Sequence, residues 1–419
     1  MSPTLRGADI VMRTLDAAGC TRVFTLSGNH IMSLFDAALE TKLDLVHVRH
    51  EAAAVHMADA WGRLAGTPGI AMVTGGPGHA NAAAALFTAR GQESPLVLLS
   101  GHTATHELGR GGFQELRQAE MAAPVAKASW TARATETLGQ DIATAWRTAV
   151  SGRPGPVHLS LPSDLLDRVV AANAVAWPAR DAFTAPPVGL ADPAATAVLE
   201  LIAGARRPLL IAGPQLATRR GRALLERITA AVGLPGCVME SPRGLNDATL
   251  GAFAAVIRRA DLIVLLGKPL DFTLKFGDLP GEGAERRWIV LDPEAALLDR
   301  AARELGSSLV FACLAEAHPA GEALVRFAPG RAVARTEWCA EAAVRFHGRP
   351  AAWDGLTSAT PGRLHPAEVI RALRPYVARD PETVLICDGG EFAQWGQSLL
   401  AAPRRLTNGV GGSIGASLP

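Results

Sequence analysis

Apolar residues in the first 170 positions follow two alternating patterns. Short, continuous apolar runs, as in buried strands, lie at 22–26, 43–48, 69–74 and 96–100. Between them, apolar residues recur with a helical period at 10–18, 31–39, 51–64 and 79–90. Repeated strand–helix units with continuously apolar strands predict a parallel sheet covered by helices on both faces.

The same alternation returns twice along the chain, each time after an irregular segment. Residues 171–194 hold four prolines and no periodic pattern, and 329–364 hold scattered Pro, Gly and Arg, so both are interpreted as linkers. We therefore predict an α/β fold with three doubly wound, Rossmann-like parallel-sheet domains. Their bounds are 1–170, 190–328 and 365–419. The last supplies only the first strand–helix elements of a domain, so we expect further chain or a second polypeptide to complete it.

Composition and charge exclude several classes of protein. Apolar residues make up 48% of the 419 residues, and 41 basic residues balance 40 acidic ones. This balance gives no electrostatic reason to expect nucleic acid or an anionic membrane as a partner. The five cysteines are far apart in the sequence and show neither a disulfide framework nor zinc spacing. With no signal-like or membrane-spanning apolar run, we expect a cytoplasmic protein.

Two strand-to-helix turns carry residues suited to ligand binding. The first contains Arg49-His50-Glu51, and the second contains Thr74-Gly75-Gly76-Pro77-Gly78. Ligands of open α/β sheets bind at the carboxyl ends of the strands. Glycines let a backbone approach a ligand closely, and the helix after the second turn presents free N–H groups. Taken alone, Glu51 is better explained as a first-turn acid favoured by the helix dipole, and the glycines match neither a dinucleotide fingerprint nor a P-loop.

Taken in order, these and other motifs resemble one family. The matching segments are 26–29, 49–54, 58–60, 62–63, 74–81, 112–115, 153–157 and 161–162. Together they resemble the thiamine diphosphate-dependent enzymes of the acetolactate synthase, pyruvate decarboxylase and 2-hydroxyacyl-CoA lyase superfamily. The resemblance implies a first domain that binds the aminopyrimidine ring, a Rossmann-like central domain, and a third domain that binds diphosphate and Mg²⁺. It also implies a homodimer, or a tetramer built from dimers, with the active site at the subunit interface.

The resemblance gives Glu51 a catalytic role. A carboxylate bound to N1′ of the aminopyrimidine favours its imino tautomer, whose nitrogen then removes the thiazolium C2 proton. For this role Glu51 should be desolvated. The other cofactor-binding residues implied in this domain are Asn29, Thr74, Gly78 and Asn81.

Three more residues are candidates for catalysis. His30 and His79 follow turns that face the thiazolium in the family, so either is a candidate donor to a substrate carboxylate or oxyanion. Gln114 matches a glutamine that lines the active site in acetolactate synthases. A structural or surface role for each of the three stays open at this point.

The third domain resembles the diphosphate-binding part of these enzymes. The implied cofactor-binding residues there are Gly390, Glu391, Phe392, Ser413 and Ile414. In the family, a large apolar side chain at the Ile414 position supports the cofactor in a bent shape. Glu391 departs from the pattern, because acetolactate synthases commonly have glutamine there. The family's Gly-Asp-Gly metal motif would follow Pro419, so no metal ligand is assigned within these residues.

These observations lead to one hypothesis and two alternatives. We expect a thiamine diphosphate- and Mg²⁺-dependent lyase or carboligase that acts on a small 2-oxo acid, similar to acetolactate synthase. One alternative is a 2-hydroxyacyl-CoA lyase or another 2-oxo acid decarboxylase, and the other is a non-catalytic fragment or degenerate member of the family. The turn Gly213-Pro214-Gln215 is no dinucleotide fingerprint, so FAD is possible but not favoured in the central domain. The sequence does not identify the substrate.

Overall fold

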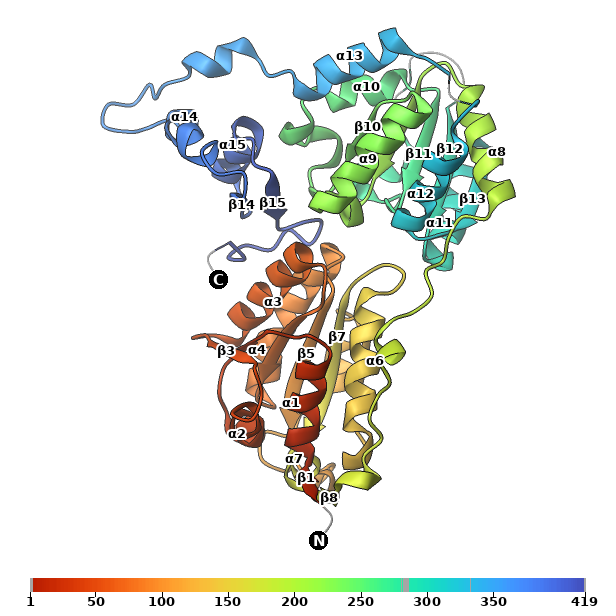
Figure 1. Cartoon of the computed structure of the whole chain (residues 1–419). Coiled ribbons are helices and arrows are strands. Elements are labelled where there is room, and N and C mark those ends of the chain that lie inside the picture. The colour runs from red at the N-terminus through yellow and green to blue at the C-terminus, as the bar shows by residue number, and fades with distance from the viewer. Residues whose placement is uncertain (1–2, 280, 282–285, 332, 418–419) are drawn as a thin grey trace. The chain divides into compact units, whose positions relative to one another are not determined.

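Two parallel sheets form the centres of the two units into which the computed structural model of the chain divides (Figure 1). The structure describes residues 3–279, 281, 286–331 and 333–417. The first unit ends at Pro186, and the second runs from Pro187 to Ser417. The predicted α/β class with parallel sheets is confirmed.

The first unit contains a six-stranded sheet in the order β3-β2-β4-β5-β7-β6, in which every neighbouring pair is parallel. Its strands are β2 (Arg22–Thr25), β3 (Asp44–His47), β4 (Gly69–Val73), β5 (Leu96–His102), β6 (Ala128–Thr131) and β7 (Pro156–Pro162). The strands β1 (Thr4–Arg6) and β8 (Val169–Ala171) pair antiparallel in a separate small sheet. The helices are α1 (Gly7–Ala17), α2 (Met32–Ala38), α3 (Glu51–Ala65), α4 (Pro77–Gly91), α5 (Gln118–Ala122), α6 (Leu138–Val150) and α7 (Ser163–Asp167).

Helices cover both faces of this sheet, as the continuous apolar strands predict. In β4, Ile70 and Met72 enter the core that packs against α1, α2 and α6. Ala71 and Val73 enter a second core, formed with α3 and α4. Successive side chains of a strand point to opposite faces, so a strand buried on both sides must be apolar throughout.

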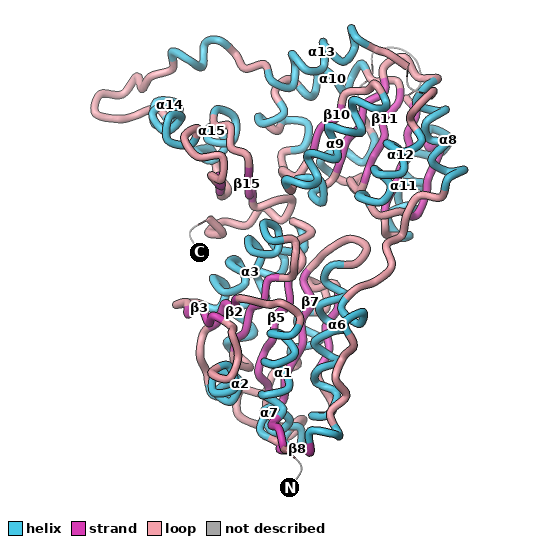
Figure 2. The backbone as a smooth tube through the Cα atoms, viewed as in Figure 1, coloured by secondary structure: helices cyan, strands magenta, loops and turns pink. Residues whose placement is uncertain are grey.

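The second unit contains a five-stranded parallel sheet in the order β10-β9-β11-β12-β13 (Figure 2). Its strands are β9 (Pro208–Ala212), β10 (Gly236–Val238), β11 (Leu262–Leu266), β12 (Arg287–Asp292) and β13 (Leu309–Leu314). The helices of this part are α8 (Asp192–Ala203), α9 (Arg219–Val232), α10 (Phe253–Arg259), α11 (Ala295–Leu305), α12 (Ala317–Phe327) and α13 (Thr336–His347).

The last part of the second unit has a two-stranded parallel sheet, β14 (Val384–Cys387) with β15 (Arg404–Thr407). The helices α14 (Pro366–Val377) and α15 (Glu391–Leu399) pack on it around a small apolar cluster. Its strands run parallel, as in the two large sheets. The division of the second unit into two separate domains stays a prediction.

The segment 329–364 is not the plain linker that its composition predicts. Residues 336–347 form α13, which buries Trp338, Ala342 and Phe346 in the core of the five-stranded sheet. The Trp338 indole also donates a 2.8 Å hydrogen bond to Pro208 O at the start of β9. These three residues stand four apart, on one helical face, but apolar residues off that face, such as the exposed Val344, obscure the pattern.

Arg335, just before α13, holds the ends of two other helices. Its guanidinium donates to Ile202 O at 2.7 Å and Ala203 O at 3.2 Å, at the end of α8. It also donates to Gly233 O at 3.2 Å, at the end of α9. A cation is favourable at these carbonyl ends, where the helix dipoles are negative.

Replacing Arg335 with methionine is therefore expected to lower the free energy of unfolding of the second unit by about 2–3 kcal/mol, because several charge-assisted bonds are lost together. Arg331→Met is the matched control, since the exposed Arg331 side chain makes one hydrogen bond within the described residues, to Phe327 O at the end of α12. We expect its loss to stay below about 1 kcal/mol. Chemical denaturation of both variants measures the difference, and equal losses would contradict the capping role.

No helix among the described residues is long and apolar enough to cross a membrane.

Candidate active site

The carboxyl ends of β2, β3, β4 and β5 meet at one edge of the six-stranded sheet, because neighbouring strands are parallel. The loops that leave these strands contain most of the candidate residues of the first unit. This edge is where open α/β sheets bind their ligands.

Glu51 is the first residue of α3, directly after the loop that leaves β3. His50 caps the helix by accepting a hydrogen bond from the Ala52 N–H at 3.1 Å. The side-chain amide of Asn81, in α4, donates to Glu51 Oε2 at 3.0 Å. The structure thus brings two predicted residues from separate helices together. Glu51 is partly exposed in this chain, so the expected desolvation is not supplied by the described residues alone.

Close backbone packing explains the glycines beside Glu51. A Cβ atom on Gly78 would lie 2.7 Å from Thr74 Cγ2 and 3.4 Å from Glu51 Oε1. A Cβ atom on Gly28 would lie 2.4 Å from Thr74 Cβ. The Thr74 side chain therefore fills the space between two glycines, and no side chain stands between Gly78 and the Glu51 carboxylate.

Gly76 gives the turn its shape. Its backbone angles are φ 57° and ψ −113°, which L side chains rarely adopt, and a Cβ atom there would lie 2.6 Å from Gln114 O. Pro77 follows as the first residue of α4, where the missing N–H costs no helical hydrogen bond. Both conformation and space therefore require glycine at this position.

His30 lies at the same edge, in the short helical turn 29–31 after β2, together with exposed Asn29. The imidazole is buried, its Nδ1 lies 3.3 Å from Thr74 Oγ1, and its ring stacks on Phe113 with centroids 5.8 Å apart. Burial lowers the pKa of His30, so its ring is neutral at pH 7. The structure brings His30 close to the glycine turn, but its catalytic role remains a prediction.

Gln114 reaches the site from the loop after β5. Its backbone has a positive φ of 56°. Its Cβ lies close to Gly76, because a Cβ atom on that glycine would be 2.7 Å from it. The loop is tied back to β5 by Thr103, whose hydroxyl donates to Phe113 O at 3.0 Å. Gln114 Oε1 is buried and accepts no hydrogen bond from the part of the chain that the structure describes. Buried polar atoms are normally hydrogen-bonded, so this acceptor beside the turn is a candidate contact for a ligand.

The Glu115 carboxylate organises this loop. It accepts hydrogen bonds from the N–H groups of Gly109, Gly111 (2.9 Å) and Gly112 (3.1 Å). These bonds, the one from Gly109 first, lower the pKa of Glu115. Because the folded-state pKa is lowered, the bonds support the loop fully above the unfolded pKa of about 4.3 and are lost as pH falls through the folded value.

We expect Glu115→Gln to speed amide hydrogen exchange of residues 109–112 at neutral pH, because an amide keeps only one of the two acceptor oxygens. Acidification should erase the difference between wild type and variant, and hydrogen-exchange mass spectrometry measures both effects. The exposed Glu120, in α5, provides the control Glu120→Gln. A difference that persists when Glu115 is protonated would contradict the role of its carboxylate in holding this loop.

His79 does not lie where the family resemblance implies. It is fully buried, with Nδ1 2.9 Å from Ser100 Oγ and its ring centroid 4.4 Å from that of His158. Burial lowers its pKa to about 4. A neutral ring with no exposed surface has no access to a substrate in this conformation, so the structure supports a core role for His79 instead of a donor role.

No sequence pattern indicated Gln118, the first residue of α5, which is 1% exposed. Its Oε1 accepts a 2.8 Å hydrogen bond from the Gly76 N–H. Its Nε2 donates to Gly101 O at 3.1 Å and to Ser160 Oγ at 3.0 Å. A glutamine in a mixed polar segment carries no pattern that marks it as buried.

In the second unit, the predicted diphosphate-binding residues gather around Asp388. Asp388 Oδ1 accepts from the Gly389 N–H at 2.7 Å, and Oδ2 accepts from the Gly415 N–H at 2.6 Å and the Ser417 hydroxyl at 3.3 Å. This carboxylate joins the turn after β14 to the segment 411–417. The candidates in these two segments are Gly390, Glu391, Phe392, Ser413 and Ile414.

The side chains in this cluster are largely open to solvent. Ile414 is 81% exposed and Phe392 52% exposed. Glu391 is also exposed, at the first position of α15. The supporting role of Ile414 therefore stays a prediction. The described residues hold no group of three or more His, Cys, Asp or Glu placed for a metal ion.

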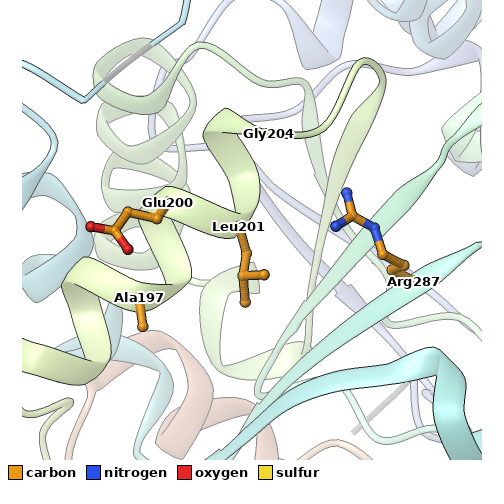
Figure 3. Close-up of a pocket in the computed structure, with 5 residues that line it drawn as sticks. All are labelled: Ala197, Glu200, Leu201, Gly204 and Arg287. Atoms are coloured by element: carbon orange, nitrogen blue, oxygen red, sulfur yellow. The ribbon is translucent and has the colours of Figure 1, made fainter.

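A separate hollow of about 400 Å³ lies in the second unit between α8 and β12 (Figure 3). It is lined by Ala197, Glu200, Leu201, Gly204 and Arg287. Arg287 is the first residue of β12, so the hollow lies at the amino end of that strand. Ligands of parallel sheets bind at the opposite ends, and we assign this hollow no role in the candidate site.

Comparison with known proteins matches the part of the chain that contains the candidate residues of the first unit. Residues 5–121 match the family described as thiamine pyrophosphate enzyme, N-terminal TPP binding domain. That range includes Glu51, the glycine turn and Asn81, together with Gln114 and Gln118.

Similar full-length proteins carry two kinds of name. The acetolactate synthase large subunit IlvG of Mycobacterium tuberculosis is 31% identical over 286 residues, 66% of this chain and 51% of the relative. The acetolactate synthase of Bacillus subtilis is 28% identical over 436 residues, 99% of this chain and 73% of the relative. The 2-hydroxyacyl-CoA lyase 2 of Danio rerio is 31% identical over 309 residues, 65% of this chain and 50% of the relative. The chain spans about half the length of most curated relatives it matches.

Proposed function

We propose, from the match of residues 5–121 to the N-terminal TPP-binding domain of thiamine pyrophosphate enzymes, that the protein is a thiamine diphosphate-dependent C–C bond lyase or carboligase that acts on a 2-oxo acid. Several relatives are named acetolactate synthase, which supports a carboligation of that type. The observation that carries the proposal is the Glu51 carboxylate, held by Asn81 beside the side-chain-free Gly78.

The residues at this edge fit the aminopyrimidine ring of thiamine diphosphate. Asn81 donates to Oε2 of Glu51, which leaves Oε1 to face the space that a Gly78 side chain would fill. A carboxylate held in this way accepts a hydrogen bond from a ring nitrogen, or holds a proton at Oε1. Asn29 and Thr74 would line the same edge. When bound, thiamine diphosphate supplies an acidic carbon centre and an electron sink, which no amino acid side chain offers.

The second unit also contains segments suited to a diphosphate group. Helix α15 begins at Glu391, directly after the 388–390 turn, and no side chain among the described residues caps its first turn. The backbone N–H groups at this helix start are suited to an anion. We propose Gly390, Glu391, Phe392, Ser413 and Ile414 as contacts of the diphosphate end. Mg²⁺ is part of this proposal as the usual partner of a diphosphate, with no described residue assigned as its ligand.

Glu51 is partly exposed and Asn81 is exposed, which supports a second proposal, that the enzyme is a homodimer or a tetramer built from dimers. A carboxylate that controls a proton works best away from water, and a second copy of the chain at this edge would exclude water from it. Sedimentation of the full-length protein tests this. A monomer at micromolar concentration in the presence of cofactor would contradict the oligomer.

Titration calorimetry of the full-length protein with thiamine diphosphate and Mg²⁺ tests the cofactor assignment. Stoichiometric binding, followed by pyruvate consumption with formation of acetolactate, is the expected result. Cleavage of a 2-hydroxyacyl-CoA with no reaction of pyruvate would favour the second named group of relatives. Absence of binding would overturn the proposal and favour a non-catalytic member of the family.

A further inference from the structure

We propose that Gln118 is a positioning residue, which fixes the glycine turn and thereby the Glu51–Asn81 pair. The inference rests on the proposed function for its catalytic meaning, but its structural part is measurable without cofactor. Gln118 lies outside the family-like segment 112–115, and its side chain bonds to neither Glu51 nor Asn81.

Gln118 links three separate elements through one buried amide. Its oxygen accepts from Gly76 in the turn, and its nitrogen donates to Gly101 O of β5 and to Ser160 Oγ of β7. A side-chain amide has one acceptor oxygen and two donor hydrogens, so both kinds of group are in use. An apolar residue of the same size would fill the volume but satisfy none of these bonds.

The bond to Gly76 matters because this N–H has no partner within α4. Gly76 is the cap residue of that helix, and its left-handed conformation directs the N–H toward Gln118. A buried N–H without an acceptor is costly, so the turn would move to find one. The neighbouring Gly75 also lies close to this side chain, since a Cβ atom on Gly75 would be 3.1 Å from Gln118 Oε1.

Movement of the turn would reach Glu51 through one helix. Gly76 precedes α4, and Asn81 stands in the same helix with its amide on Glu51 Oε2. Gly78, whose missing side chain opens the space beside Glu51 Oε1, lies between them. Through the turn and α4, Gln118 therefore positions Asn81, which bonds to the Glu51 carboxylate, and Gly78, which leaves space beside it. Displacements of about 1 Å at such sites cost up to about 100-fold in rate.

The test compares Gln118→Met and Gln118→Glu with Glu120→Gln, an exposed position in the same helix. In the full-length protein without cofactor, we expect Gln118→Met to speed amide exchange in residues 74–81 at least tenfold. Thiamine diphosphate affinity, measured by calorimetry with Mg²⁺, should fall about tenfold. Glu120→Gln should leave both unchanged.

Gln118→Glu separates positioning from simple packing. A protonated glutamic acid presents C=O to Gly76 and O–H to Gly101, so it imitates glutamine, whereas the carboxylate repels the Gly101 carbonyl. Amide exchange in 74–81 should therefore return toward the wild-type pattern as pH is lowered, after correction for the intrinsic exchange rate. Gln118→Met should show no such return.

Two results would overturn the inference. One is wild-type amide exchange in residues 74–81 of Gln118→Met, and the other is a Gln118→Glu variant without pH-dependent recovery. If Gln118→Met does not fold, Ser160→Ala removes one anchor of the amide and should give a smaller increase in the same segment. If wild-type protein binds no thiamine diphosphate, the proposed function fails, while the exchange data still decide whether Gln118 holds the turn.

Discussion

Replacing Glu51 with glutamine is expected to lower turnover and exchange of the cofactor C2 proton by about 100- to 10,000-fold, the usual contribution of a positioned acid–base group. Glutamine preserves size and the acceptor oxygen near Asn81, but it neither holds nor releases a proton at the position of Oε1. Proton exchange at C2, followed by NMR in deuterated buffer, measures the step directly.

The control for this experiment is Glu40→Gln, an exposed acid in the loop after α2. It should exchange the C2 proton at the wild-type rate. Glu51→Gln should keep the wild-type unfolding midpoint, because Glu51 is partly exposed. Wild-type C2 exchange in Glu51→Gln would remove Glu51 from the mechanism, whatever the affinity for the cofactor.

The sequence predicted those parts of the fold and site in which pattern and structure are local. Continuous apolar runs located β2, β4 and β5 because these strands are buried on both faces. Glycine-rich turns located the carboxyl edge because only glycine allows the conformation of Gly76. The ordered set of motifs made both Glu51 and Asn81 candidates, but their contact was not predicted, since 30 residues separate the two.

The parts that were missed depend on buried polar residues and on distant partners. The strand β7 is buried throughout but contains His158 and Ser160, which interrupt its apolar run. Gln118 owes its importance to Gly76, Gly101 and Ser160, none of which is near it in sequence. Such residues lack a periodic signal, because their burial is stabilised by hydrogen bonds and not by hydrophobicity.

His79 shows that a local pattern can also correct a family inference. It stands three, four and seven residues before Ala82, Ala83 and Leu86, all buried on one side of α4. This spacing alone predicts an inward-facing ring. The resemblance placed His79 toward the ligand because it follows the glycine turn, but the direction of a helical side chain is set by its place around the helix axis.

The buried pair His79 and His158 leads to the second large expected effect, an acid-sensitive first unit. Burial lowers the pKa of both rings, that of His79 to about 4, and His79 adds a like-charge penalty for protonating His158. His102 contributes to the same repulsion. Ser100 and Gln118 face His79 with neutral groups, and Ser129 and Ser160 face His158, so no described carboxylate offsets a positive charge there.

The sign of the pH effect follows from the protons bound. Between about pH 6.5 and pH 4, the unfolded chain protonates His79 while the folded chain does not, so the free energy of unfolding falls as pH falls. A shift from 6.5 to about 4 corresponds to roughly 3 kcal/mol for His79. His158 acts in the same direction. Above pH 6.5 neither ring contributes, because both are neutral in both states.

Urea denaturation of the full-length protein at several pH values measures this effect. The first unit of the wild-type protein should lose roughly 3 kcal/mol or more between pH 7 and pH 4. In His79→Gln the amide keeps a hydrogen bond near Ser100 but does not titrate. The free energy of unfolding of this variant should therefore fall less steeply as pH is lowered. His106→Gln, at an exposed position, is the matched control and should keep the wild-type slope. If His79→Gln also keeps that slope, the buried ring accepts a proton without cost, and the argument for a neutral core pair is wrong.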